Sequence, residues 1–229
     1  GLSLHNTKHI IQANAMVSPY YANQSSSLAT TFALDFKLQT ALSANWRLRS
    51  SVRGMSSIGD ARTFFLVGGS YNDLLVSDQN SSFTSYYTPA LFFNLYGVRG
   101  FNANYRNGNT AAVATLEVVT DVAKVLYQRP ISNEFFRNLE AGLFFDIGTA
   151  FYGTGFYAPQ NSINTQQAVS NTGSVSATVN ISKVPTIYSF GTQVTTAMYG
   201  YHFGLSYAIG KEEEIWRKPM VHLHVGFPI

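Results

Sequence analysis

From Leu28 to Leu42 the chain alternates residue by residue between two kinds of side chain. One set, mostly large and apolar, is Leu28, Thr30, Phe32, Leu34, Phe36, Leu38, Thr40 and Leu42. The other set, small or polar, is Ala29, Thr31, Ala33, Asp35, Lys37, Gln39 and Ala41. A helix would spread both sets around its circumference, whereas successive side chains of a β-strand point to opposite faces. The pattern predicts one long strand with an apolar face and a polar face.

The same alternation recurs along the chain. It is clear in residues 139–151, 200–210 and 220–227, and weaker in residues 6–19, 45–57, 62–72, 83–96, 111–126 and 186–198. Strands of soluble proteins average about 5–6 residues, and a tilted strand that crosses a membrane needs about 9–11. The predicted strands number about ten and most are longer than the soluble average. We therefore predict an all-β fold, an antiparallel transmembrane β-barrel.

The composition agrees with a body that meets lipid outside and water inside. Charged residues make up 12% of the chain, about half the share that is usual in soluble domains. The net charge of +3 comes without a Lys/Arg run, so no nucleic-acid partner is predicted. Absence of cysteine excludes disulfides and thiolate metal sites. No apolar run reaches the roughly 18 residues of a membrane helix, and no basic, apolar leader opens the chain.

The connections between predicted strands differ in length and character. Short turns are expected at Ser43–Asn45 and Tyr199–Gly200. The segment Gln160–Asn180 is polar and uncharged, which predicts a long external loop. Lys211–Lys218, "KEEEIWRK", predicts a solvated hairpin loop. Short turns at one end and long loops at the other are typical of outer-membrane barrels.

The stretch "LYGVRGFNAN" places Arg99 among glycines and aromatic residues. A buried guanidinium requires carboxylate partners, because an unpaired buried charge costs several kcal/mol. Glu117 in "ATLEVVTD" and Asp146 in "GLFFDIGTAF" each fall in the middle of a predicted strand, on its polar face. A loop that folds back into the barrel would bring Arg99 to both, and its planar fork suits bidentate pairing.

The order of "VRGF", "ATLEVVT" and "FFDIGTAF" resembles the barrel of the outer-membrane protein assembly superfamily. This superfamily, also described as the bacterial surface antigen barrel, includes the BamA and TamA insertases and the two-partner secretion transporters. The resemblance implies a loop motif of Val98, Arg99, Gly100 and Phe101. It also implies a latch inside the barrel in which Arg99 meets Glu117 and Asp146, with Gly148 in the second strand. The latch could gate the barrel or only pin the loop.

Two departures from the family pattern bear on domain organisation. Family members carry periplasmic domains before a barrel of sixteen strands, whereas this chain predicts about ten strands and no soluble domain. Residues 1–229 are therefore expected to be the C-terminal part of such a barrel, or a reduced barrel. The last strand ends in Ile229 rather than an aromatic residue. Its alternation still resembles the family's C-terminal signal and its strand-weakening glycine, through Val221, Leu223, Val225, Gly226 and Phe227.

The resemblance implies insertion of β-barrel proteins into, or translocation of polypeptides across, the outer membrane of a Gram-negative-type bacterium or of an organelle of such descent. The implied partners are membrane lipid, unfolded outer-membrane or secreted polypeptides, and accessory assembly subunits. No cofactor, metal or enzymatic activity is expected, since no nucleophile–base arrangement or phosphate loop is present. The alternatives are a structural or anchoring barrel of a larger protein and a diffusion pore.

Two further polar sets have a functional and a plain interpretation. Arg47, Arg49 and Arg53 share one face of a predicted strand and could line a path for polypeptide segments or anions, or could be ordinary lining of the barrel interior. His202, His222 and His224 fall on the polar faces of the last two strands. They could hold a metal, although no carboxylate or thiolate accompanies them, or simply make the interior polar.

Overall fold

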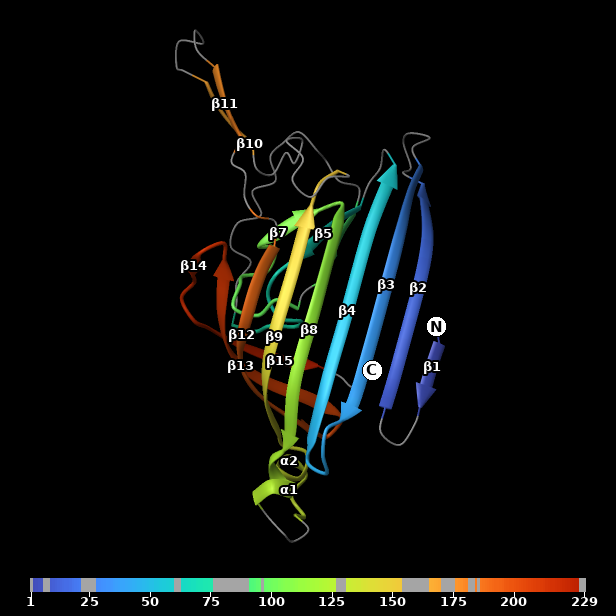
Figure 1. Ribbon diagram of the computed structural model, residues 1–229, viewed down its shortest axis with the longest axis vertical. Helices are drawn as coiled ribbons and strands as arrows, with labels where there is room; N and C mark the ends of the chain where they lie inside the picture. Colours follow the sequence, from blue (N-terminus) through green and yellow to red (C-terminus); the bar gives the residue numbers. More distant parts are fainter. Residues whose placement is uncertain are drawn as a thin grey trace.

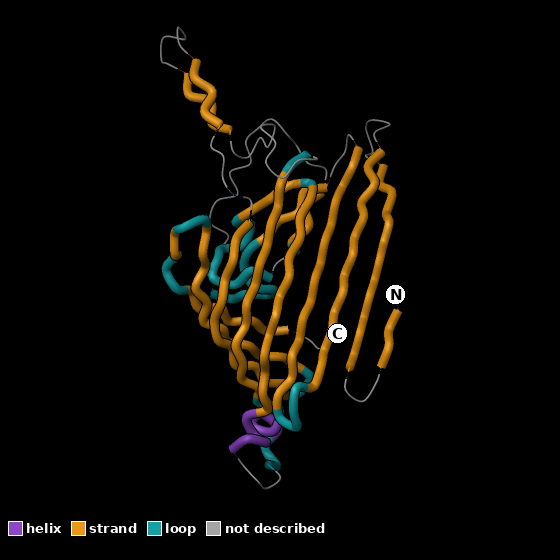
Figure 2. Tube along the Cα trace, viewed as in Figure 1, coloured by secondary structure: helices purple, strands orange, loops and turns teal. Residues whose placement is uncertain are grey.

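The computed structural model describes residues 2–5, 9–21, 28–59, 63–75, 91–95, 97–126, 131–153, 165–169, 176–180, 184 and 186–226. These residues form three β-sheets, whose strands run mostly antiparallel, and two short helices. Figures 1 and 2 show one large curved sheet with a smaller sheet against its inner side. Within the described residues, no helix is long and apolar enough to cross a membrane.

The large sheet contains ten strands, and seven of them have 12 to 14 residues. In order across the sheet they are β1 (Leu2–His5), β2 (His9–Tyr21), β3 (Leu28–Ala41), β4 (Trp46–Gly59), β8 (Thr110–Asp121), β9 (Glu140–Phe151), β12 (Thr186–Met198) and β13 (Tyr201–Glu212). β13 then pairs with both β14 (Ile215–Trp216) and β15 (Met220–Gly226). The strand lengths follow from the long alternating runs of the sequence.

A second sheet of three short strands interrupts the chain between β4 and β8. Its order is β6 (Leu91–Asn94), β5 (Thr63–Val67) and β7 (Arg106–Gly108), with β5 and β6 parallel. The third sheet pairs β10 (Thr165–Val169) with β11 (Ser176–Asn180). Helices α1 (Val122–Leu126) and α2 (Glu134–Arg137) lie between β8 and β9, at the lower end of the large sheet in Figure 1.

The prediction that residues 62–72 and 83–96 form strands of the large sheet is wrong. Their described residues form β5 and β6 of the small sheet instead. The predicted strand 111–126 is also too long, because residues 122–126 turn into α1. Gln160–Asn180, predicted as a plain loop, contains the paired strands β10 and β11. β14 lies within Lys211–Lys218 and forms a hairpin with the end of β13, as that stretch predicted.

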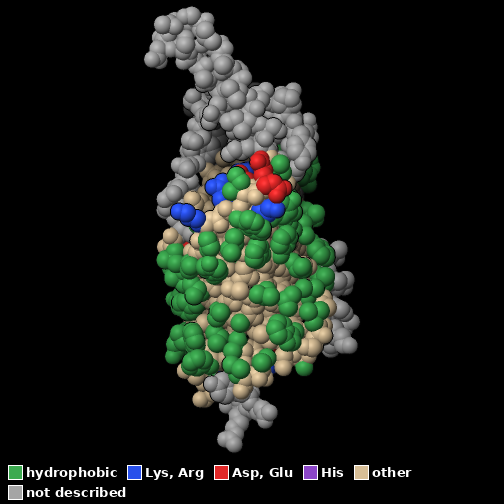
Figure 3. All heavy atoms as spheres, turned by 60° about the vertical axis from the view of Figure 1, so that its left-hand side comes forward, with side chains coloured by type: hydrophobic (Ala, Val, Ile, Leu, Met, Phe, Trp, Pro, Cys, Tyr) green, Lys and Arg blue, Asp and Glu red, His purple; other side chains and the backbone are tan. Residues whose placement is uncertain are grey.

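The two faces of the large sheet differ sharply in polarity. The inner face carries buried small and polar side chains, including Asp146, Ser189 and Ser206. The outer face exposes large apolar side chains along β9, β12, β13 and β15: Leu143, Phe145, Tyr188, Phe190, Val194, Leu205, Tyr207 and Val221. Figure 3 shows hydrophobic side chains over most of the height of one side, with charged side chains gathered near its upper end. The exposed apolar area is too extensive to be scattered surface residues.

The buried core lies between the small sheet and the inner face of the large sheet. β5 is buried along its whole length. The buried cluster consists of Phe65, Val67, Leu95, Val98, Phe101, Ala111, Val113, Ala150 and Ile187. It joins residues of β5 and the loop before β7 to β8, β9 and β12. β5 and the residues around Val98 and Phe101 are therefore packed inside the curve of the large sheet.

The large sheet does not close on itself within the described residues. β1 stands at one end and pairs with β2, and β15 stands at the other end and pairs with β13. The first and last strands of the sheet are therefore not paired with each other among the described residues.

Candidate functional site

The four residues Val98–Phe101, which we call the VRGF loop, lie on the inner face of the large sheet. Two backbone hydrogen bonds hold the start of the loop, from Gly69 N to Val98 O and from Gly97 N to Gly69 O, both 3.0 Å long. Val98 is fully buried and Phe101 almost so. Because these two side chains pack into the core, the intervening Arg99 is directed along the inner face.

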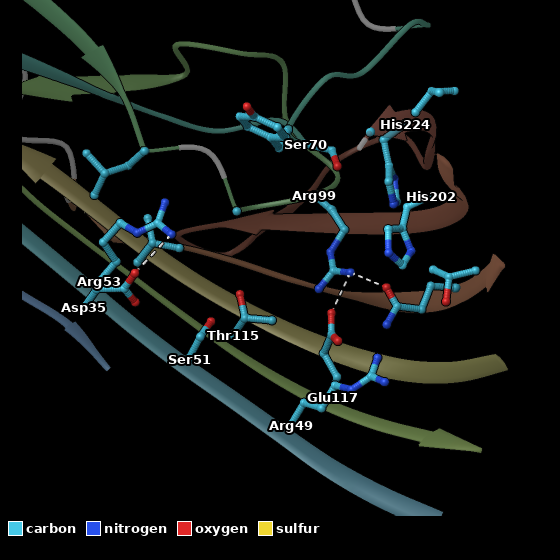
Figure 4. A pocket seen from close by; sticks show the side chains of 18 residues that line it. Asp35, Arg49, Ser51, Arg53, Ser70, Arg99, Thr115, Glu117, His202 and His224 are labelled. Atoms are coloured by element: carbon cyan, nitrogen blue, oxygen red, sulfur yellow. Dashed lines mark hydrogen bonds and ion pairs between the residues drawn. The ribbon is translucent and has the colours of Figure 1, made fainter. Parts of the chain in front are cut away.

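Arg99 makes a bidentate contact with Asp146 of β9. Its Nε donates to Asp146 Oδ2 at 2.8 Å and its Nη2 to Oδ1 at 2.7 Å, while its backbone N–H donates to Oδ2 at 3.1 Å. Nη1 lies 3.0 Å from Glu117 Oε1 of β8 and donates to Gln193 Oε1 of β12 at 2.6 Å. The two carboxylates predicted from the sequence are thus both in contact with Arg99. Figure 4 shows Arg99 directed at Glu117.

The surroundings of the ion pair make it strong and costly to disrupt. The Asp146 side chain is completely buried, and those of Arg99 and Glu117 are 9% and 18% exposed. The guanidinium carbon also lies 3.5 Å from the centre of the Phe144 ring, a cation–π contact. Burial by itself lowers the pKa of Arg99, but the hydrogen bonds to Asp146 and its negative charge outweigh burial and raise that pKa above its ordinary value. The guanidinium is a permanent cation.

Two glycines make room for the loop. Gly100 has a φ of +82°, a conformation that favours glycine, and a Cβ there would lie 2.9 Å from Gly210 N. A Cβ on Gly148 would lie 2.4 Å from Val98 Cγ2 and 2.9 Å from Val67 Cγ1. Gly100 and Gly148 therefore let the VRGF loop approach β13 and β9 closely.

We expect Gly148→Ala to destabilise the protein by about 1–3 kcal/mol, because the added methyl group displaces Val98 and Val67 from the core. The matched control is Gly54→Ala on β4, where a Cβ would meet nothing within 4 Å. Replacement of a strand glycine with open space around it is expected to be neutral or stabilising. Urea unfolding of both variants in detergent micelles measures the difference, and equal stabilities would contradict this packing.

His222 of β15 holds the VRGF loop from the other side. Gly100 N–H donates to His222 Nε2 at 2.7 Å, and His222 Nδ1 lies 2.5 Å from Asp73 Oδ2. The His222 side chain is completely buried. Because Nε2 accepts a backbone N–H, the ring proton must be on Nδ1, where it is donated to Asp73. The loop is thus fixed to β15 as well as to β8, β9 and β12.

A second charged cluster anchors the chain just after the VRGF loop. Glu212 at the end of β13 accepts hydrogen bonds from Tyr105, Arg106 and Arg217. Burial, and then the hydrogen bond to Glu212, raise the pKa of Tyr105. The Phe101 and Tyr105 rings are 4.7 Å apart, so the cluster is continuous with the core.

The basic set Arg47, Arg49 and Arg53 lies on the inner face of β4, and each member is paired with an acid. Arg47 contacts Asp121 and Glu140, and Arg49 Nη1 lies 2.8 Å from Glu140 Oε2. Arg53 Nη2 lies 3.5 Å from Asp35 Oδ2. This pairing favours the interpretation as interior lining, because the acids neutralise the arginines.

A cavity of about 730 Å³ lies between Arg49 and Arg53 of this set and Arg99 of the VRGF loop. Asp35, Arg49, Arg53, Glu117, His202 and His224 are among its lining residues, as Figure 4 shows. The described residues contain no group of three or more side chains placed to share a metal ion. The His222 ring bonds Asp73 and the Gly100 N–H, whereas His202 and His224 line the cavity.

The predicted C-terminal signal is described only in part. Val221 is exposed on the outer face, while Leu223, Val225 and Gly226 are half-buried. Phe227 lies outside the described residues. Leu223 is notable because its backbone N–H and C=O point away from β13, toward Asp73 and Leu74.

Sequence reasoning missed Gln193 and Asp73 as partners of the loop motif and treated His222 only as part of a polar set. The contacts join residues 94, 122 and 149 positions apart. The one available signal was that Gln193 and His222 fall on the polar faces of their predicted strands, and Asp73 carried no such signal. No protein-family model matches the chain, and no curated protein matches it either.

Proposed function

We propose that this chain is a transmembrane β-barrel, or the C-terminal part of one, that assists insertion of β-barrel proteins into the outer membrane or translocation of polypeptides across it. The long strands and the apolar outer face support the membrane location, since seven strands exceed the roughly 9–11 residues that a tilted crossing needs. The ion-paired inner face would line the interior. The resemblance of the VRGF, Glu117 and Asp146 segments to the outer-membrane assembly superfamily supports the activity.

The observation that carries this proposal is the position of β15. It is the last strand of the large sheet, its outer face is apolar, and His222 ties it directly to the VRGF loop. On the side away from β13, Leu223 bonds Asp73 and Leu74, and His224 forms a single bridge with Asp73. Among the described residues no named strand pairs with that side of β15, so its edge is suited to strand addition.

Strand addition explains how such an edge would act without a cofactor. An unpaired backbone N–H or C=O in lipid costs several kcal/mol, so an open edge and an unfolded barrel strand favour pairing with each other. Main-chain hydrogen bonds give this pairing its affinity, and alternating side chains set its register. The partners would be membrane lipid and unfolded outer-membrane or secreted polypeptides, with accessory subunits delivering them.

The test is the folding of an unfolded eight-stranded barrel protein into liposomes with and without this protein reconstituted in the membrane. We expect the protein to accelerate the appearance of the folded client. Identical rates with and without it would overturn the proposal. Steady ion conductance without acceleration would instead favour the diffusion pore. The absence of both conductance and acceleration would favour an anchoring barrel.

A further inference from the structure

The segment Gly69–Leu75, which we call the strap, runs from the VRGF loop to the edge of β15 that faces away from β13. At its start, Gly69 forms an antiparallel bridge with Val98. At its end, Asp73 forms an antiparallel bridge with His224 of β15. Leu74 N donates to Leu223 O at 2.7 Å. The strap therefore occupies the edge of β15 in the manner of a very short added strand.

The carboxylate of Asp73 holds the strap in this position. Its Oδ1 accepts from Leu75 N at 3.0 Å, which closes a turn, and from Leu223 N at 3.3 Å. Its Oδ2 receives the His222 ring proton. The Asp73 side chain is 6% exposed. One carboxylate thus satisfies the edge N–H of Leu223 that an incoming strand would otherwise bond.

His222 connects this contact to the VRGF loop. Its two ring nitrogens bond Asp73 on one side and Gly100 N–H on the other, so the strap, β15 and the loop share one buried imidazole. Movement of Asp73 away from the edge removes the acceptor of the Nδ1 proton. The position of the strap and the position of the loop are therefore linked through His222.

We propose that the strap is an internal competitor for the β15 edge, which must leave Leu223 before another polypeptide strand can pair there. This inference rests on the proposed function, because it assumes that β15 accepts strands. It adds a means of control: the edge is covered at rest, and a polypeptide strand that displaces Leu74 and Asp73 exposes it.

A reversible disulfide tests the strap directly, because the chain contains no cysteine. The Asp73–His224 bridge makes Leu74 and Leu223 the next opposed pair. Directly opposed residues have Cβ atoms about 4.5–5.5 Å apart, close to the reach of a disulfide. In Leu74→Cys/Leu223→Cys, mild oxidation should lock the strap onto the edge, and reductant should release it.

The probe is a fluorescein-labelled peptide, MVHLHVGFPI, with the sequence of residues 220–229, followed by anisotropy in detergent micelles. We expect oxidation to weaken its binding by at least about tenfold, the equivalent of about 1.4 kcal/mol. Asp73→Ala, which frees the edge, should bind more tightly than the unaltered protein. The matched control, Ser50→Cys/Leu116→Cys, places a disulfide between paired residues of β4 and β8 and should leave binding unchanged on oxidation.

Equal peptide binding to the oxidised and reduced strap variant would overturn the inference, whatever the result of the client-insertion assay. So would failure of the disulfide to form, or failure of the peptide to bind any form. If only the locked strap blocks peptide binding but client insertion is not accelerated, the result supports the strap and overturns the proposed function.

Discussion

Asp146→Ala is expected to lower the free energy of unfolding by about 3–5 kcal/mol, because it leaves a buried guanidinium without its main partner. Asp146 is fully buried and accepts the Nε, Nη2 and backbone N–H of Arg99. Its loss should also free the VRGF loop, so that protease cuts near Arg99 in the folded protein. Urea unfolding in micelles and limited proteolysis by trypsin measure the two effects.

The destabilisation caused by Asp146→Ala is to be compared with that caused by Glu117→Ala. Glu117 is 18% exposed and meets Arg99 through a single nitrogen at 3.0 Å, so its removal should destabilise the protein less. Arg99→Ala should loosen the loop as Asp146→Ala does. If Asp146→Ala proves no more destabilising than Glu117→Ala and the loop stays protected, then the ion pair does not fix the loop.

Leu223→Pro is expected to abolish the acceleration of client insertion while the protein still folds. The Leu223 N–H points away from β13, so proline removes an edge donor without breaking the ladder between β13 and β15. An incoming strand would then meet an edge that cannot donate at its centre. Insertion rates into liposomes are compared for the variant and the unaltered protein.

The control for this prediction is Leu223→Ala, which shortens the same side chain but keeps the N–H. It should retain most of the acceleration. Full activity of the proline variant, with its fold verified by circular dichroism, would mean that insertion does not use the β15 edge.

The large sheet could be predicted because its strands have two different faces. Leu28–Leu42, predicted from alternation alone, matches β3 to within one residue. The contact of Arg99 with Asp146 and Glu117 could also be anticipated, since a charge-poor chain offers few acids in the middle of strands. In both cases a pattern in the local sequence agrees with a simple physical requirement. Alternation suits a strand with two different faces, and a buried guanidinium requires carboxylate partners.

The small sheet and the strap could not be predicted in this way. β5 is buried on both faces, so its sequence "TFFLV" has no alternation to distinguish it from other short apolar runs. The position of β5 inside the large sheet depends on packing against β8 and β9, which lie far from β5 in the sequence. The Asp73–His222 contact joins residues 149 positions apart, and neither local sequence differs from an ordinary turn or strand.

The membrane orientation of the large sheet is the claim on which the proposed function depends, and tryptophan quenching tests it most directly. With Trp46 and Trp216 replaced by phenylalanine, a single tryptophan is placed at Val194, exposed on the outer face, or at Thr115, on the inner cavity. In vesicles of lipids with brominated acyl chains, we expect strong quenching at position 194 and little at position 115, with the reverse order for aqueous iodide. Quenching of position 194 by iodide and not by brominated lipid would contradict the account.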